Sequence, residues 1–113
     1  MIPSFEDRRE FERFIVELPV KFMCLDSNIE RQGKTSNISP VGIGLIAQES
    51  LGLNTYLELR LQIPNSNLPL YTRGSVVWST KTKDDKYDIG ILLEEVDLIG
   101  MSRILRAMRG QKS

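Results

Sequence analysis

Three arginines lie close together near the start of the sequence, where Arg8, Arg9 and Arg13 form the pattern RRxxxR. Each guanidinium offers a planar fork of N–H donors that can grip a phosphate or the edge of a guanine base. Three such groups on one short segment can gather on a single small anion. A solvated arm, in which carboxylates such as Glu10 and Glu12 pair with the arginines, fits the same residues.

A second polar motif has the pattern NxSxxG and consists of Asn37, Ser39 and Gly42. Asn37 supplies both a hydrogen-bond donor and an acceptor, and Ser39 supplies a hydroxyl. Gly42 permits a positive φ or a close approach of the backbone to a ligand. An ordinary turn fits these residues too, because Asn, Ser, Pro and Gly are all favoured in turns.

The residues needed for most catalytic and metal sites are missing from the sequence. It contains no histidine and one cysteine, Cys24, which excludes Ser-His-Asp triads, Cys-His dyads, cysteine metal cages and an intramolecular disulfide. Neighbouring carboxylates such as Asp84 and Asp85 fall where solvated side chains are expected. We therefore expect no enzyme activity, no cofactor and no bound metal.

The overall charge argues against a long nucleic acid as the ligand. The 15 basic and 15 acidic residues cancel, so no global field favours a polyanion, and any anion must be met by a local cluster. Neither a signal peptide nor an apolar run of membrane-spanning length is visible, which leads us to expect a cytoplasmic location without membrane insertion.

The elements that must position these motifs are mostly strands. Apolar residues alternate with polar ones along several short segments, the pattern of a strand with one buried face. Pro19 removes one backbone donor, so we expect an edge position or a bulge there. The spacing predicts about six strands in a small antiparallel barrel or sandwich. The predicted strands cover residues 14–24, 30–36, 41–47, 57–63, 70–79 and 87–94.

The period changes near the C-terminus. Leu98, Met101, Leu105 and Met108 fall at helical spacing, with Ile104 beside them. This predicts an amphipathic helix over about residues 97–109, with Asp97 as its N-cap and Gly110 as its stop. The apolar stripe needs a partner, and the open end or flank of the barrel would supply it. The basic face of the helix fits an acidic partner as well as plain solvation. Residues 1–13 form a predicted mobile arm ahead of a single domain over residues 14–113.

Together, in this order and strand context, the two motifs resemble those of the PilZ domain family. That family carries RxxxR on an N-terminal loop, matched by Arg9 and Arg13 with Arg8 before them. It carries [D/N]xSxxG at the start of a strand, matched by Asn37, Ser39 and Gly42. Further similar segments are Leu18-Pro19-Val20, Gly74-Ser75-Val76-Val77-Trp78 and Tyr87-Asp88-Ile89-Gly90-Ile91. The resemblance covers about residues 8–108.

The resemblance implies an all-β fold, a six-stranded antiparallel barrel followed by a C-terminal helix. It also implies that the chain binds the bacterial second messenger cyclic di-GMP. Arg8, Arg9 and Arg13 would then hold phosphates and guanine edges, Asn37 and Ser39 would bond a guanine, and Gly42 would keep its strand close. Trp78 fits two roles, stacking on a guanine or sealing the core.

We expect such a receptor to change conformation when the ligand draws the N-terminal arm onto the barrel, and to signal through the new surface to a protein partner. Two other functions fit parts of the sequence. One is a PilZ-like interaction module that binds no nucleotide. The other is a nucleic-acid-binding barrel of the OB type, disfavoured by the zero net charge and the few aromatic residues.

Overall fold

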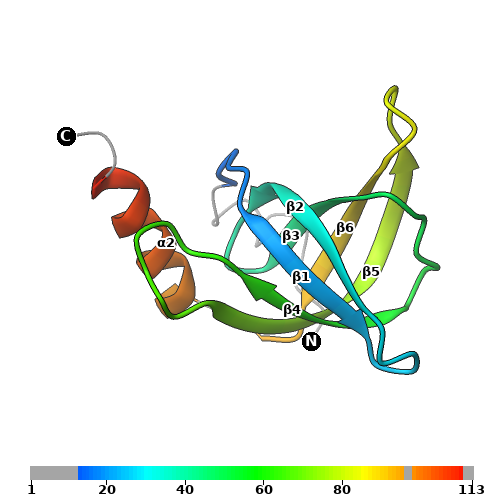
Figure 1. Ribbon diagram of the computed structural model, residues 1–113, viewed down its shortest axis with the longest axis horizontal. Coiled ribbons are helices and arrows are strands. Elements are labelled where there is room, and N and C mark those ends of the chain that lie inside the picture. The colour runs from blue at the N-terminus through cyan, green and yellow to red at the C-terminus, as the bar shows by residue number, and fades with distance from the viewer. Residues whose placement is uncertain (1–12, 96–97, 111–113) are drawn as a thin grey trace.

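The computed structural model describes residues 13–95 and 98–110, and it confirms the predicted antiparallel barrel with a C-terminal helix (Figure 1). The bounds of the predicted strands shift by at most a few residues, apart from the first. The strands are β1 (Pro19–Cys24), β2 (Glu30–Ile38), β3 (Gly42–Ala47), β4 (Tyr56–Leu61), β5 (Leu70–Lys81) and β6 (Tyr87–Leu93). The helix is α2 (Leu98–Gly110).

The six strands close into a barrel in the order β1-β2-β3-β6-β5-β4, with every neighbouring pair antiparallel. Closure comes from the pairing of β1 with β4, two strands that are separated by β2 and β3 in sequence. A closed barrel leaves no strand with an unpaired edge. The motif-bearing strands β2 and β3 therefore lie beside β6 and β5, which come from the second half of the chain.

The expectation for Pro19 was wrong. Pro19 is the first residue of β1, which pairs with β2 on one side and β4 on the other, so it occupies neither an edge nor a bulge. A strand's first residue is the other position that tolerates proline's missing N–H. The preceding residues, predicted as strand, instead contact β2 at separate points, through the bridge from Phe14 to Ile38 and a hydrogen bond from the Leu18 N–H to the Thr35 hydroxyl.

The core fills the barrel with the apolar members of each alternating strand. Leu57, Leu59 and Leu61 of β4 are all buried, whereas Glu58 and Arg60 between them are not. Burying each such side chain contributes roughly 1.5–3 kcal/mol, and a barrel of this size is filled by its own side chains. A ligand site would therefore lie on the outer surface of the barrel.

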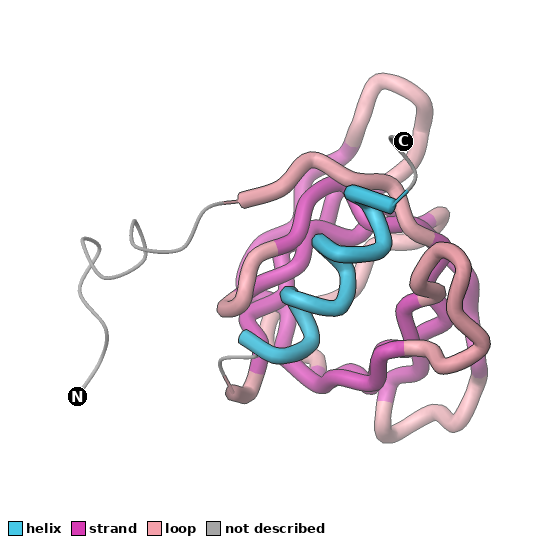
Figure 2. The backbone as a smooth tube through the Cα atoms, turned by 90° about the vertical axis from the view of Figure 1, so that its left-hand side faces the viewer, coloured by secondary structure: helices cyan, strands magenta, loops and turns pink. Residues whose placement is uncertain are grey.

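The helix α2 lies across one open end of the barrel (Figure 2). Met101 and Ile104 are buried against the core. The buried face is thus rotated from the predicted stripe, because Ile104 is fully covered whereas Leu105 is only half-buried. The Arg103 guanidinium donates to the Leu68 carbonyl at 2.8 Å, which ties the helix to the β4–β5 loop.

The ends of α2 differ from their predicted form. The predicted N-cap, Asp97, lies outside the described residues, and the helix includes Gly110 rather than stopping before it. No helix in the described part of the chain is long and apolar enough to cross a membrane.

Candidate functional site

The fold brings the last arginine of the first motif onto the asparagine of the second. Arg8 and Arg9 lie outside the described residues, but Arg13 is described. Phe14, the next residue, exchanges two backbone hydrogen bonds with Ile38 at the end of β2, at 2.8 and 2.9 Å. This bridge places Arg13 beside β2, and its Nη1 donates to the Asn37 Oδ1 at 2.9 Å.

The second motif forms the tight connection between β2 and β3. Ser39 and Gly42 face each other across this connection, with backbone hydrogen bonds at 2.9 and 3.4 Å. The Ser39 hydroxyl accepts from the N–H groups of Val41 and Gly42, at 3.3 and 3.1 Å, and the Ser39 side chain is buried. Its hydrogen-bonding capacity is thus used within the turn, as the ordinary-turn interpretation of this motif expects.

The glycine of this motif serves a close approach and not a positive φ. No described glycine has a positive φ. A Cβ atom on Gly42 would lie 3.0 Å from the Ile91 carbonyl oxygen of β6, which is tighter than ordinary contact. Gly42 therefore lets β3 and β6 approach each other at the edge of the site.

A bulge in β2 turns Asn37 onto the outer surface. Thr35 pairs with Leu45 and Asn37 with Gly44, so Ser36 is an extra residue in β2. Such bulges commonly re-aim a side chain beside a functional site. The amide of Asn37 lies over Gly44, where an added Cβ would be only 2.6 Å from its Nδ2.

A second bulge does the same for Trp78 in β5. Val76 pairs with Ile91 and Trp78 with Gly90, so Val77 is extra. Regular alternation would point Trp78 inward with Val76, but the bulge turns it outward and leaves it 38% exposed. The core-anchor alternative for Trp78 is therefore wrong. Its indole lies on Gly90, where an added Cβ would overlap the ring.

One row across the neighbouring strands β2, β3, β6 and β5 is formed by Asn37, Gly44, Gly90 and Trp78. Gly44 of β3 pairs with Gly90 of β6, with Asn37 on one side of the pair and Trp78 on the other. From the sequence alone we predicted no role for Gly44 or Gly90. A glycine inside an alternating strand is the signal that could have found them, because it marks a close approach of another group.

The row borders a hollow on the outside of β3, β6 and β5, which we call the arginine hollow. It brings residues of both motifs together with Trp78. Its lining residues are Arg13, Ser39, Val41, Gly42, Ile43, Val77, Trp78, Gly90, Ile91 and Leu92. Within residues 13–95 and 98–110, Arg13 forms no ion pair, so among these residues a neutral amide is its partner. The hollow thus combines an arginine with a partly exposed indole ring.

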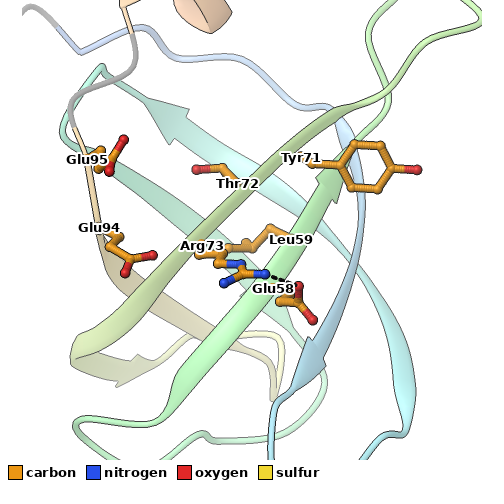
Figure 3. A pocket seen from close by; sticks show the side chains of 7 residues that line it. All are labelled: Glu58, Leu59, Tyr71, Thr72, Arg73, Glu94 and Glu95. Atoms are coloured by element: carbon orange, nitrogen blue, oxygen red, sulfur yellow. Dashed lines mark ion pairs between the residues drawn. The ribbon is translucent and has the colours of Figure 1, made fainter.

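A larger hollow lies elsewhere, on β4, β5 and the end of β6, and has a volume of about 590 Å³ (Figure 3). We call it the acidic hollow. It is lined by Glu58, Leu59, Tyr71, Thr72, Arg73, Glu94 and Glu95. Its arginine, Arg73, forms an ion pair with Glu58 at 3.3 Å. The acidic hollow has three carboxylates and one arginine that is already paired, which disfavours an anionic ligand. Its larger volume is therefore no reason to place the anion site there.

Among the described residues, Tyr56 and Cys24 lie outside the arginine hollow and have shifted pKa values. A hydrogen bond from the Tyr56 hydroxyl to the Glu94 carboxylate, beside the acidic hollow, is the main cause that raises the pKa of Tyr56. Burial raises the pKa of the Cys24 thiol, which disfavours the reactive thiolate. In the described part of the chain, no three His, Cys, Asp or Glu side chains are grouped so that they could hold a metal ion.

Comparisons with known proteins support the same fold. A family model described as the PilZ domain matches residues 7–110. No curated protein matches the sequence. The Bacillus subtilis inhibitor of motility MotI/DgrA is similar, with a TM-score of 0.70 and 20% identity over 96% of this chain and 56% of its own.

Two similar structures contain c-di-GMP. The PilZ domain of YcgR from Escherichia coli, solved with c-di-GMP, has a TM-score of 0.66 and 11% identity, covering 93% of this chain and 95% of its own. The K. pneumonia MrkH–c-di-GMP complex has a TM-score of 0.64 and 14% identity, covering 92% and 51%. The chain thus spans about half the length of MotI/DgrA and MrkH.

Proposed function

This chain belongs to the PilZ domain family, and from that premise we propose that it is a receptor for cyclic di-GMP and not an enzyme. The observation that carries the proposal is the 2.9 Å hydrogen bond from Arg13 to Asn37. It joins the two motifs across 24 residues of sequence, beside an exposed tryptophan. The presence of c-di-GMP in the similar YcgR and MrkH structures supports the same ligand class.

The chemistry of the arginine hollow suits this ligand. Cyclic di-GMP is a compact dianion with two flat guanine faces and acceptor-rich edges. The Arg13 guanidinium would donate to a phosphate or to guanine O6 and N7, and the exposed face of Trp78 would stack on a base. The Asn37 oxygen would accept from the guanine N1–H or N2–H. Arg8 and Arg9 would add further donors from the same segment.

We assign Ser39 and Gly42 indirect parts in this site. The Ser39 hydroxyl holds the turn that carries Asn37, and it would bond a guanine only by giving up one of its contacts within the turn. Gly42 would keep β3 against β6 beside the ligand. On this reasoning Ser39→Ala weakens binding by loosening the turn, whereas Asn37→Ala weakens it by removing a direct contact.

Binding would become a signal through residues 1–13. The phosphates would draw Arg8 and Arg9 toward the hollow where Arg13 already lies, and the newly formed surface would be offered to a protein partner in the bacterial cytoplasm. The ligand can shift this equilibrium only by its difference in affinity for the two arrangements. Hydrogen exchange of residues 1–13, measured with and without saturating cyclic di-GMP, tests this step. Unchanged exchange would contradict it.

Calorimetric titration of the full chain with cyclic di-GMP tests the receptor function itself. We expect saturable binding with a defined stoichiometry, accompanied by a change in the emission of Trp78, the sole tryptophan. Cyclic di-AMP serves as a matched control with the same charge and different base edges. Absence of binding at ligand concentrations on the order of 0.1 mM would contradict the proposal and favour the nucleotide-independent interaction module.

A further inference from the structure

Asn37 is held by a chain of hydrogen bonds that extends beyond both motifs. Its Nδ2 donates to the Ser36 Oγ at 3.1 Å, and the Ser36 hydroxyl donates to the Asp88 Oδ1 at 3.2 Å. At the other end, Arg13 donates to the Asn37 Oδ1 at 2.9 Å. Ser36 is the extra residue of the β2 bulge, and Asp88 belongs to β6, so a strand distant in sequence supports the motif residue.

The donors and acceptors in this series of hydrogen bonds allow only one orientation of the Asn37 amide. An ionised carboxylate only accepts, so the single hydrogen of the Ser36 hydroxyl points toward Asp88. The Ser36 oxygen is then left as an acceptor, which only the NH₂ end of Asn37 can satisfy. The amide oxygen must therefore face Arg13, as observed.

The absence of a side chain at Gly44 leaves room for this arrangement. An added Cβ there would overlap the Ser36 Oγ and lie 2.6 Å from the Asn37 Nδ2. The network therefore depends on three neighbouring strands, with the bulge on β2, the glycine on β3 and the carboxylate on β6.

We propose that Ser36 and Asp88 are positioning residues that lock the Asn37 amide with its oxygen toward Arg13, which lines the arginine hollow. The lock makes the site present an acceptor beside guanidinium donors. This part of the inference rests on the proposed nucleotide function. The amide oxygen is an acceptor and therefore selects guanine, whose N1–H and N2–H groups are donors. Adenine has an acceptor at N1 and no N2 amino group, so the locked amide discriminates against it.

An exchange of the amide and the carboxylate tests the lock without any ligand. In Asn37→Asp, two carboxylates compete for one Ser36 hydrogen, and this outweighs the exposed ion pair that the new carboxylate gains with Arg13. We therefore expect the Tm to fall by at least about 4 °C. In Asp88→Asn the new amide oxygen still accepts from Ser36, so the Tm changes little. In the double variant the amide at position 88 donates to Ser36, whose hydroxyl donates to the carboxylate at position 37. The Tm then returns to within about 2 °C of wild type.

Asp84→Asn is the matched control, because Asp84 lies in the β5–β6 turn, apart from the network. Combined with Asn37→Asp, it removes the same charge and should rescue nothing. If Asp84→Asn rescues as well as Asp88→Asn, or if neither does, the lock is contradicted whether or not the protein binds a nucleotide.

Nucleotide selectivity gives a second measurement that a purely structural role would not move. In Ser36→Ala only Arg13 still orients the amide, so we expect the ratio of affinities for cyclic di-GMP over cyclic di-AMP to fall about tenfold. An unchanged ratio in a folded, binding variant would contradict the role in selectivity. If the wild type binds neither nucleotide, the proposed function and this selectivity fail together, and the Tm series alone decides the lock.

Discussion

The arginine hollow and the acidic hollow both lie on the outside of the barrel and each contain an arginine, yet they offer opposite environments. In the acidic hollow, Arg73 pairs with Glu58 and shares the surface with Glu94 and Glu95 (Figure 3). In the arginine hollow, Arg13 donates to the neutral amide of Asn37. An arginine whose charge is already balanced gains little from a phosphate, whereas Arg13 has no carboxylate partner among the described residues. The partner of the arginine, and not the volume of the hollow, decides which surface suits an anion.

Removing the arginine of each hollow in turn should show the largest difference between the two hollows. We expect Arg13→Ala to weaken cyclic di-GMP binding at least about a hundredfold, because hydrogen bonds to charged groups contribute about 1.5–3 kcal/mol each and Arg13 would form more than one. Arg73→Ala should leave the affinity within about twofold. Calorimetric titration measures both. Equal losses in the two variants would mean that the arginine hollow is not the binding surface.

The glycine row should be the next most sensitive feature. In Gly90→Ala the new methyl group overlaps the Trp78 ring, so the indole must move. We expect a loss of stability of about 1–3 kcal/mol in urea unfolding and about tenfold weaker binding or more. Gly52→Ala is the control, because its Cβ would meet only the Thr55 hydroxyl at 3.6 Å. Unaltered Trp78 emission in Gly90→Ala would argue against this contact.

Each hollow also exposes one aromatic ring, Trp78 in one and Tyr71 in the other. Stacking of a base on an aromatic ring contributes about 1–3 kcal/mol, so Trp78→Ala should weaken binding about tenfold, with a smaller loss in Trp78→Phe. Tyr71→Ala should have no effect on affinity. If truncation of Tyr71 weakened binding more than truncation of Trp78, the ligand would lie over the acidic hollow instead.

The smallest expected effect concerns the pH response of the acidic hollow. The Glu94 carboxylate accepts a hydrogen bond from Tyr56 and thereby raises the pKa of Tyr56. A raised pKa in the folded state means that this contact stabilises the fold below about pH 10 and is lost as the pH rises through the folded pKa. Glu94→Gln should lower the pKa of Tyr56 in an NMR titration and leave cyclic di-GMP binding unchanged. An unshifted pKa would show that the carboxylate is not the cause.

Much of the fold could be predicted because its signals are local. The alternation of Leu57, Leu59 and Leu61 assigns a buried face within one strand, whatever that strand later pairs with. The two motifs were recognisable for the same reason, since their residue types and spacing lie within short segments. Where a residue's role depends on its partner strand, as for Pro19, the local pattern was insufficient.

By itself, the sequence determined the set of strands, the helix and the residue types on which the proposed dinucleotide site depends. Only the tertiary structure decided that Arg13 contacts Asn37, that Trp78 faces outward, and that two glycines lie between them. The reason is that a bulge is defined by the register between two strands. One extra residue reverses which face a side chain occupies, and that register exists only once β2, β3, β6 and β5 have paired.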